Sequence, residues 1–266
     1  MSEGLFFVMN RISRLFQEKP GNILSIYFTA GFPRLHDTLP ILTALQHGGA
    51  DLVEIGMPFS DPVADGETIQ QSNQQALDNG MTLALLFEQL QAMRETIALP
   101  VLLMGYINPV IQYGVEAFCQ KCEEVGVDGL ILPDLPLEVY AEEYKPVFDR
   151  HGLLNVFLIT PQTNEARIRQ IDALTEGFIY MVSSASVTGA KAGISDRQEA
   201  YFQRVAAMNL KNPRVVGFGI SNRETFEKAT RHAQGAIIGS AFVKLLVQQG
   251  TSPQAISVYL KAVKGI

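Results

Sequence analysis

Three carboxylates in and after one apolar stretch are the residues whose types and spacing best suit catalysis. Glu54 lies inside the run LVEIG, and Asp61 and Asp65 follow in the segment MPFSDPVADG. A carboxylate is costly to bury in an apolar strand unless it is paired or has a function. Taken singly, Asp61 and Asp65 indicate turns, because Asp before Pro or Gly is the usual chemistry of a turn. Together with Glu54 they indicate general acid–base catalysis in one pocket, and a Glu54 that only binds a loop amide is the structural alternative.

Glycine placement near the end of the chain is the second functional signal. The segment GFGIS follows one apolar run, and GSAF ends the next. Each joins a predicted strand to the start of a helix, where free backbone N–H groups and the helix dipole favour an anion. Ser221 and Glu224 are predicted to form a capping box, and Gly239–Ser240 is predicted to open a helix. Either site alone would indicate a tight turn, but both together predict a bound phosphate.

A long segment of small residues, Ser183 to Asp196, follows the run FIYMV. Connections in α/β units usually have about 2–6 residues, and a longer one is often a lid over a site. We therefore predict a lid here. Lys191 lies in this segment and outside any predicted strand, so a solvated lysine is favoured over a Schiff-base lysine.

Histidine and cysteine give no sign of a metal centre or of a serine nucleophile with its base. All the histidines fall in predicted helices or turns, and no GxSxG motif follows a strand; they are His36, His47, His151 and His232. Cys119 and Cys122 form the motif CQKC, but the segment has helical spacing and no second pair that would complete a zinc site. We expect both thiols to pack in a helix, and we expect no metal.

Eight short apolar runs alternate with segments of helical periodicity along the chain. Runs without polar alternation are typical of strands buried on both faces, as in a parallel sheet covered by helices. Eight such units predict a (β/α)8 TIM barrel, whose functional residues meet at the carboxyl ends of the strands. A doubly wound sheet competes with it, but the fingerprint GxGxxG does not follow the first run. The runs are ILSIYF, LVEIG, PVLLM, GLILP, LNVFLI, FIYMV, RVVGF and AIIGS.

The barrel is predicted to be a single domain over residues 1–266, because no linker, charge block or low-complexity tract divides the chain. Its length suits a TIM barrel, which typically has about 250 residues. An extra N-terminal helix is expected from apolar residues at helical spacing, namely Leu5, Val8, Met9, Ile12, Leu15 and Phe16.

Composition limits the partners of the chain. Hydrophobic residues make up 47% and charged residues 18%, so the chain can bury a large core. Lys and Arg number 21 against 27 Asp and Glu, a net charge of −6 without a basic run, which argues against nucleic acid. No uncharged apolar run approaches the ~20 residues that span a bilayer, and Glu3 stands where a signal peptide carries bases. We expect a cytoplasmic protein with no nucleic-acid or membrane partner.

The sequence resembles the tryptophan synthase α subunit family from about Leu5 to about Lys264, through the motifs EIGMPFSDPVADG, PDLP, SVTG, GFGIS and GSAF. The resemblance implies a TIM-barrel lyase that needs no cofactor and cleaves indole-3-glycerol phosphate to indole and glyceraldehyde 3-phosphate. It also implies a β subunit as partner in an α2β2 heterotetramer for tryptophan synthesis, with pyridoxal phosphate on that partner. In the lid, some relatives have Arg and Gly in place of Ser184 and Ser186.

Site residues are implied by the same resemblance. The catalytic carboxylates fall on Glu54 and Asp65, a tyrosine near the indole on Tyr180, and a lid threonine on Thr188. The phosphate contacts fall on Gly189, Gly219, Gly239 and Ser240. The full set of substrate-binding residues that we expect is Tyr27, Tyr106, Tyr180, Thr188, Gly189, Gly217, Gly219, Gly239 and Ser240.

The chemistry of such a cleavage fits two carboxylates. Asp65 would accept a hydrogen bond from the ring N–H, and Glu54, with a pKa raised by an apolar setting, would move protons to the ring carbon or from the hydroxyl. An apolar slot for indole is expected from residues near strand ends, namely Tyr27, Met104, Ile131, Ile159, Tyr180 and Phe218. The partner is expected to bind apolar, proline-containing loops around Pro58 to Asp61, Asn108–Pro109 and Asp134 to Pro136.

Two other functions are alternatives. A sugar-phosphate isomerase or epimerase would require a strand-end Lys or His, which the sequence does not offer. A catalytically silent subunit that only binds a phosphorylated ligand is disfavoured by the presence of both Glu54 and Asp65.

Overall fold

Nine strands form one parallel sheet in the computed structural model, which describes residues 9–62, 65–183, 195–217 and 219–266. Their order in the sheet is β5-β4-β3-β2-β1-β9-β8-β7-β6, so that elements adjacent in the chain are adjacent in space. The strands are β1 (Ile23–Thr29), β2 (Leu52–Gly56), β3 (Val101–Met104), β4 (Gly129–Ile131), β5 (Leu154–Val156), β6 (Leu158–Ile159), β7 (Ile179–Val182), β8 (Arg214–Gly217) and β9 (Gly235–Ile238).

All eight predicted runs form strands, and the fifth one forms two. The run LNVFLI becomes β5, which pairs with β4, and β6, which pairs with β7. Phe157 separates them, and its carbonyl accepts a hydrogen bond from the Tyr180 N–H at 2.9 Å. The chain thus changes its pairing partner at Phe157, and the ring of strands closes through the chain itself. This closed parallel ring is the predicted TIM barrel, and it excludes the open doubly wound sheet.

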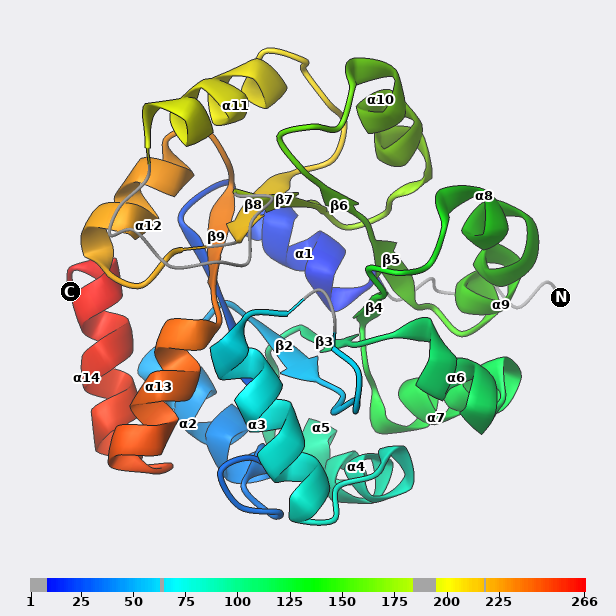
Figure 1. Cartoon of the computed structure of the whole chain (residues 1–266), viewed down its shortest axis with the longest axis vertical. Coiled ribbons are helices and arrows are strands. Elements are labelled where there is room, and N and C mark those ends of the chain that lie inside the picture. The colour runs from blue at the N-terminus through cyan, green and yellow to red at the C-terminus, as the bar shows by residue number, and fades with distance from the viewer. Residues whose placement is uncertain (1–8, 63–64, 184–194, 218) are drawn as a thin grey trace, which may run out of the picture.

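Helices surround the ring of strands (Figure 1). They are α1 (Arg11–Glu18), α2 (Thr38–Gly48), α3 (Glu67–Asp78), α4 (Leu83–Leu90), α5 (Met93–Thr96), α6 (Ile107–Tyr113), α7 (Val115–Val125), α8 (Leu137–Val139), the π-helix η1 (Tyr140–Tyr144), α9 (Lys145–Arg150), α10 (Glu165–Leu174), α11 (Asp196–Ala206), α12 (Arg223–Thr230), α13 (Ser240–Gln249) and α14 (Pro253–Lys264).

Helix α1 covers the amino-terminal end of the barrel and lies at the centre of the ring in Figure 1. Asn10 caps it by accepting from the Ile12 N–H at 2.9 Å, and its side-chain amide donates to the Asp128 carbonyl, just before β4, at 2.8 Å. Ile12 is fully buried. Met9, which was predicted on the apolar face, is 43% exposed because the helix begins only at Arg11. Leu5 and Val8 lie outside the described residues.

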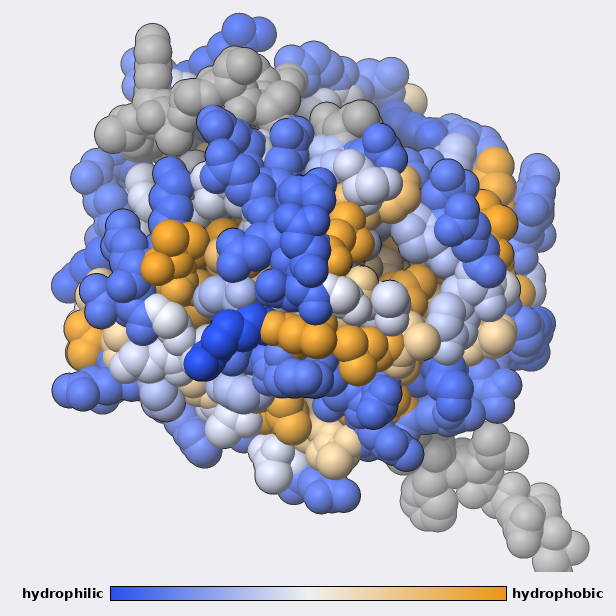
Figure 2. Space-filling model, turned by 60° about the horizontal axis from the view of Figure 1, so that its bottom comes forward, coloured by the Kyte–Doolittle hydropathy of each residue, from blue (hydrophilic) through white to orange (hydrophobic). Residues whose placement is uncertain are grey.

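Buried apolar side chains fill both the inside of the barrel and the layer between sheet and helices. Every residue of β1 and of β2 is buried, as expected for strands covered on both faces. Figure 2 shows one face of the molecule, on which hydrophobic residues reach the surface in small groups between hydrophilic ones. None of the helices in the described part of the chain is both long and apolar enough to span a bilayer.

Candidate active site

Glu54 is fully buried in the middle of β2, where the parallel register pairs it with Tyr27 of β1 and Leu102 of β3. One carboxylate oxygen, Oε1, accepts a hydrogen bond from the Ser25 hydroxyl at 2.7 Å. The other, Oε2, has no hydrogen-bond partner among the described residues. Burial raises the pKa of Glu54 to about 8, against the opposing effect of the Ser25 hydrogen bond. Glu54 is therefore mainly protonated at neutral pH and holds a proton that it can transfer.

Asp65 follows β2 and is partly exposed. Its Oδ2 accepts a hydrogen bond from the Tyr106 hydroxyl at 3.3 Å, and its carbonyl accepts one from the Gln70 side chain of α3 at 2.9 Å. Burial raises the pKa of Asp65 to about 6, while the Tyr106 hydrogen bond opposes the rise. Asp65 is thus mainly ionised at neutral pH, whereas Glu54 is mainly protonated.

Asp61 does not join this pair. It lies exposed in the loop after β2, and its Oδ2 accepts a hydrogen bond from the neighbouring Ser60 hydroxyl at 2.6 Å. The structure therefore supports the turn interpretation for Asp61, while it brings Asp65 into the barrel mouth.

A narrow pocket opens beside Asp65. Three of the predicted residues line it, namely Tyr27, Met104 and Tyr106, together with Met57, Asn73, Gly105 and Pro133. Ile131 and Ile159, which were expected in the indole slot, are fully buried in β4 and β6 and are not among the lining residues. Phe218 lies outside the described residues. Sequence reasoning missed Asn73 of α3, whose buried side-chain oxygen has no hydrogen-bond partner among the described residues; an amide among several in QQSNQQ carries no signal of its own.

Two buried tyrosines pack closely against glycines at the ends of strands. A Cβ on Gly56 of β2 would lie 2.1 Å from the Tyr27 hydroxyl oxygen, and a Cβ on Gly217 of β8 would lie 2.3 Å from that of Tyr180. Only glycine leaves room for these phenols. Burial, together with the charges of Asp65 and Glu54, raises the pKa of both tyrosines, so both stay neutral.

We expect Gly217→Ala to lower the rate of catalysis, because the new methyl group must push the Tyr180 phenol out of its place. A displacement of about 1 Å in an active site can cost ~10²-fold in rate. Steady-state turnover and the melting temperature should be measured on the same preparation. Gly21→Ala is the matched control, because its Cβ position has no atom of the described residues within 4 Å. Equal turnover in both variants would contradict this role for Gly217.

The predicted phosphate site lies at the carboxyl ends of the adjacent strands β8 and β9. Gly219 has a positive φ of 71°, and none of the described residues lies within 4 Å of its Cβ position, which suits a close approach by a ligand. Gly239 is the N-cap of α13, and Ser240 is its first residue. Both stand at the amino-terminal end of α13, where the first backbone N–H groups of a helix have no partner within the helix. Thr188 and Gly189, with Lys191 and the rest of the predicted lid from 184 to 194, lie outside the described residues.

The predicted capping box of Ser221 and Glu224 is wrong. The N-cap of α12 is Asn222, which forms a capping box with Thr225, and Glu224 instead binds Lys228 at 2.9 Å. The helix begins one residue later than predicted because the Asn222 side chain accepts from the Thr225 N–H at 3.0 Å. Ser221 is therefore not the N-cap of α12, and we do not include it in the predicted anion site.

The predicted packing of the two thiols in a helix agrees with the structure. Cys119 and Cys122 are free and buried in α7, where they pack in the core. None of the histidines lies in a strand. The described residues contain no cluster of three His, Cys, Asp or Glu side chains that could hold a metal ion.

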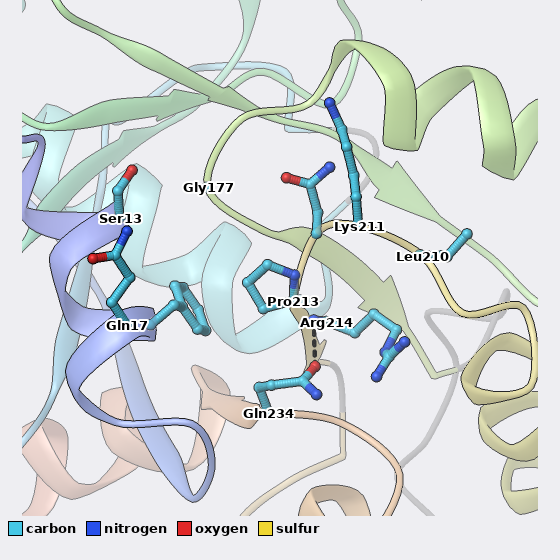
Figure 3. A pocket seen from close by; sticks show the side chains of 10 residues that line it. Ser13, Gln17, Gly177, Leu210, Lys211, Pro213, Arg214 and Gln234 are labelled. Carbon is cyan, nitrogen blue, oxygen red and sulfur yellow. Dashed lines mark hydrogen bonds between the residues drawn. The ribbon is translucent and has the colours of Figure 1, made fainter.

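A larger cavity of about 400 Å³ lies at the opposite end of the barrel, between α1 and the start of β8. Figure 3 shows Ser13 and Gln17 of α1 on one side and Pro213, Arg214 and Gln234 on the other, with the Arg214 N–H donating to the Gln234 side chain at 2.8 Å. Its lining contains no carboxylate, histidine or thiol. The ionisable side chains among its described lining residues are Lys211 and Arg214, so this cavity has no pair of carboxylates like the one toward the carboxyl ends.

The closed parallel barrel, with Glu54 inside β2 and Asp65 after its carboxyl end, defines a (β/α)8 barrel whose candidate site offers two carboxylates. The family model described as "Tryptophan synthase alpha chain" matches residues 13–264. The chain belongs to the tryptophan synthase alpha chain family.

Individual relatives agree with the family match. The tryptophan synthase alpha chain of Flavobacterium johnsoniae is 61% identical over 91% of this chain and 96% of its own length. That of Parabacteroides distasonis is 57% identical over 96% of this chain and 100% of its own length. Among solved structures, the tryptophan synthase complex from Pyrococcus furiosus matches with a TM-score of 0.82 and 35% identity, over 92% of this chain and 98% of that one. Mycobacterium tuberculosis tryptophan synthase matches with a TM-score of 0.86 and 28% identity, over 96% and 97%.

Proposed function

We propose that Glu54 and Asp65 are the groups with which this chain cleaves indole-3-glycerol phosphate to indole and glyceraldehyde 3-phosphate. The observation that carries the proposal is a pair of carboxylates, one buried inside β2 and one after the carboxyl end of that strand, with pKa values of about 8 and about 6. At neutral pH one can give a proton while the other holds a negative charge, which divides the acid and the electrostatic roles between them.

Glu54 acts on the ring carbon and on the hydroxyl in turn. Its proton goes to the ring carbon that bears the side chain, which leaves the ring nitrogen positively charged. The resulting carboxylate then takes the proton of the side-chain hydroxyl, whose oxygen becomes the aldehyde oxygen. The carbon–carbon bond breaks, its electron pair returns to the ring, and the nitrogen becomes neutral. Glu54 ends the cycle protonated, as it began.

Asp65 stabilises the charged intermediate. As an ionised carboxylate at the mouth, it accepts a hydrogen bond from the ring N–H, and this bond strengthens as the nitrogen becomes positive. The Tyr106 hydroxyl holds Asp65 from one side, and the pocket of Tyr27, Met57 and Met104 beside it offers an apolar surface for the ring. The indole and the carboxylate would thus meet at the carboxyl ends of β1 to β3.

The phosphate of the substrate would bind at the ends of β8 and β9, held by the amides of Gly219, Gly239 and Ser240 and by Gly189 of the lid segment. The helix dipole of α13 supports an anion there. A crystal soaked with glycerol phosphate should show the anion on these amides. An anion bound elsewhere, with these amides bare, would contradict the phosphate assignment.

No cofactor is required for this reaction, because it moves protons and breaks one carbon–carbon bond. We propose that pyridoxal phosphate belongs to the β subunit, which consumes the indole, and that the complex works in the cytoplasm. The experiment that tests the function is incubation of the purified chain with indole-3-glycerol phosphate while indole release is followed. Release of indole and aldehyde in equal amounts supports the lyase. Isomerised sugar phosphate, or binding without turnover, would support the two alternatives instead.

The partner should increase turnover. Phe59, in the loop expected to bind the partner, packs on Tyr106 with ring centroids 5.1 Å apart, and Tyr106 donates to Asp65. Asn108 and Pro109, expected in a loop, lie instead in the first turn of α6, where the Asp134 carboxylate accepts from the Ile107 N–H at 3.0 Å. Ile111 of the same helix is 50% exposed, as suits an interface.

We therefore expect low activity from the isolated chain and a rise when the β subunit is added, because the partner would fix Phe59, Tyr106 and with them Asp65. Indole release should be measured at constant chain concentration against increasing β subunit. Phe59→Ala should weaken the stimulation more than the basal rate. Equal turnover with and without the partner would refute this coupling.

A further inference from the structure

The Ser25 hydroxyl is buried beside the Glu54 carboxyl group. Ser25 belongs to β1, all of whose residues are buried, and its own exposed fraction is 0%. In the parallel register it pairs with Leu52, two residues before Glu54 on β2, so it lies one layer deeper than Glu54. Its Oγ donates to Glu54 Oε1 at 2.7 Å. A buried hydroxyl costs free energy unless it is hydrogen-bonded, and in this strand its partner is the carboxyl group of Glu54.

This hydrogen bond makes the two oxygens of Glu54 different. The carbonyl oxygen of a protonated carboxyl is its better acceptor, so the bond at Oε1 favours the proton on Oε2. Oε2 is buried and has no hydrogen-bond partner among the described residues. The side chain is thus anchored through one oxygen, and the other is left for the substrate.

We propose that Ser25 is a positioning residue for the lyase reaction: its hydroxyl fixes the rotamer of Glu54 and leaves Oε2 as the oxygen that gives and takes the proton. The inference rests on the proposed role of Glu54. Ser25 itself does not touch the reacting atoms.

The groups around Glu54 determine in which direction its pKa should change when the Ser25 hydroxyl is removed. The titratable groups near it are Tyr27 from β1 and Tyr180 from β7, and the neighbour from β3 is the apolar Leu102. Asp65, after β2, acts on the same two phenols. The two phenols stay neutral, and the Ser25 hydrogen bond lowers the pKa of Glu54 against the effect of burial. Loss of the hydroxyl therefore raises the pKa of Glu54 further, because the charged form loses its donor.

The test is Ser25→Ala in the full chain with the β subunit present, with indole release from indole-3-glycerol phosphate followed over a range of pH. We expect kcat to fall about 10-fold or more, because a loosened carboxyl loses its orientation, with KM within about twofold. The inflection of the pH profile due to Glu54 should move up by about half to one pH unit, the size of one net hydrogen bond. Ser25→Thr, which restores a hydroxyl, should return the inflection toward the wild-type pH.

A matched control is Thr175→Val, which removes a buried hydroxyl that has no hydrogen-bond partner among the described residues. It should leave kcat and the pH profile unchanged. A Ser25→Ala variant with a wild-type pH profile, or one that merely melts earlier, would overturn the proposal.

Combination with Glu54→Gln separates this inference from the function on which it rests. If Ser25 acts through Glu54, Ser25→Ala should cost nothing more in the Glu54→Gln background. An equal loss in both backgrounds would overturn the positioning role and leave the function standing. A Glu54→Gln variant that turns over normally would instead overturn the proposed function itself.

Discussion

Replacement of Glu54 by Gln should nearly abolish indole release while the affinity for indole-3-glycerol phosphate stays within a few fold. Gln keeps the shape of the side chain and can still accept from the Ser25 hydroxyl, but it has no proton to move. General acid–base groups contribute about 10²–10⁴-fold in rate, so a loss in that range is expected. Indole release under single-turnover conditions should give the rate. Equilibrium binding should give the affinity.

The structural alternative makes the opposite forecast for the same variant. If Glu54 only braces β2, the substitution should shift the melting temperature and leave the rate within a few fold. Asp61→Asn is the matched control, since it makes the same chemical change on an exposed carboxylate that accepts a hydrogen bond from Ser60 in its loop. In the isolated chain it should turn over like the wild type and affect mainly the contacts to the partner. A stable Glu54→Gln protein with near-native turnover would end the assignment.

Asp65→Asn should reduce turnover by about 10²–10³-fold, the typical effect of removing one group that stabilises charge in the transition state. Asn can still accept a hydrogen bond from the ring N–H, but it no longer carries the negative charge that offsets the positive nitrogen. Tyr106→Phe, which removes the hydroxyl at 3.3 Å from Asp65, should cost much less. Comparable losses in the two variants would show that the hydrogen-bond geometry matters and the charge does not.

The two carboxylates together predict a bell-shaped dependence of turnover on pH. Asp65 acts as the anion, so activity should fall as the pH drops through about 6. Glu54 starts as the acid, so activity should fall as the pH rises through about 8. The optimum is expected between the two values. In Asp65→Asn the residual rate should lose its acidic limb and keep the basic one; a profile that keeps both limbs would contradict the assignment.

Much of the fold could be read from the sequence because strands buried on both faces carry apolar runs, and all eight runs form strands. The break at Phe157 could not be read, since a change of pairing partner leaves the run LNVFLI uniformly apolar. The start of α12 was predicted one residue early because Ser221 and Asn222 are both good N-caps, and the side chain that bonds in the folded chain decides between them.

Some residues of the candidate site could be predicted from the sequence, and others could not. Glu54 stands out as a charge within an apolar run, and Gly219 as part of a glycine-rich turn. Ser25 could not be predicted, because the sequence around a serine in a buried strand does not show whether its hydroxyl binds a carboxylate or a backbone carbonyl. Asn73 could not be predicted from the sequence either, because the packing of α3 brings it to the pocket.

Infrared difference spectroscopy on wild type and Glu54→Gln would test most directly that Glu54 holds a transferable proton in the resting enzyme. The wild type should show the carbonyl stretch of a protonated carboxyl group at neutral pH, with a titration midpoint near pH 8, and the band should be missing in Glu54→Gln. A wild-type spectrum without that band at neutral pH, with Glu54 titrating near the ordinary pKa of a glutamate, about 4.3, would contradict it.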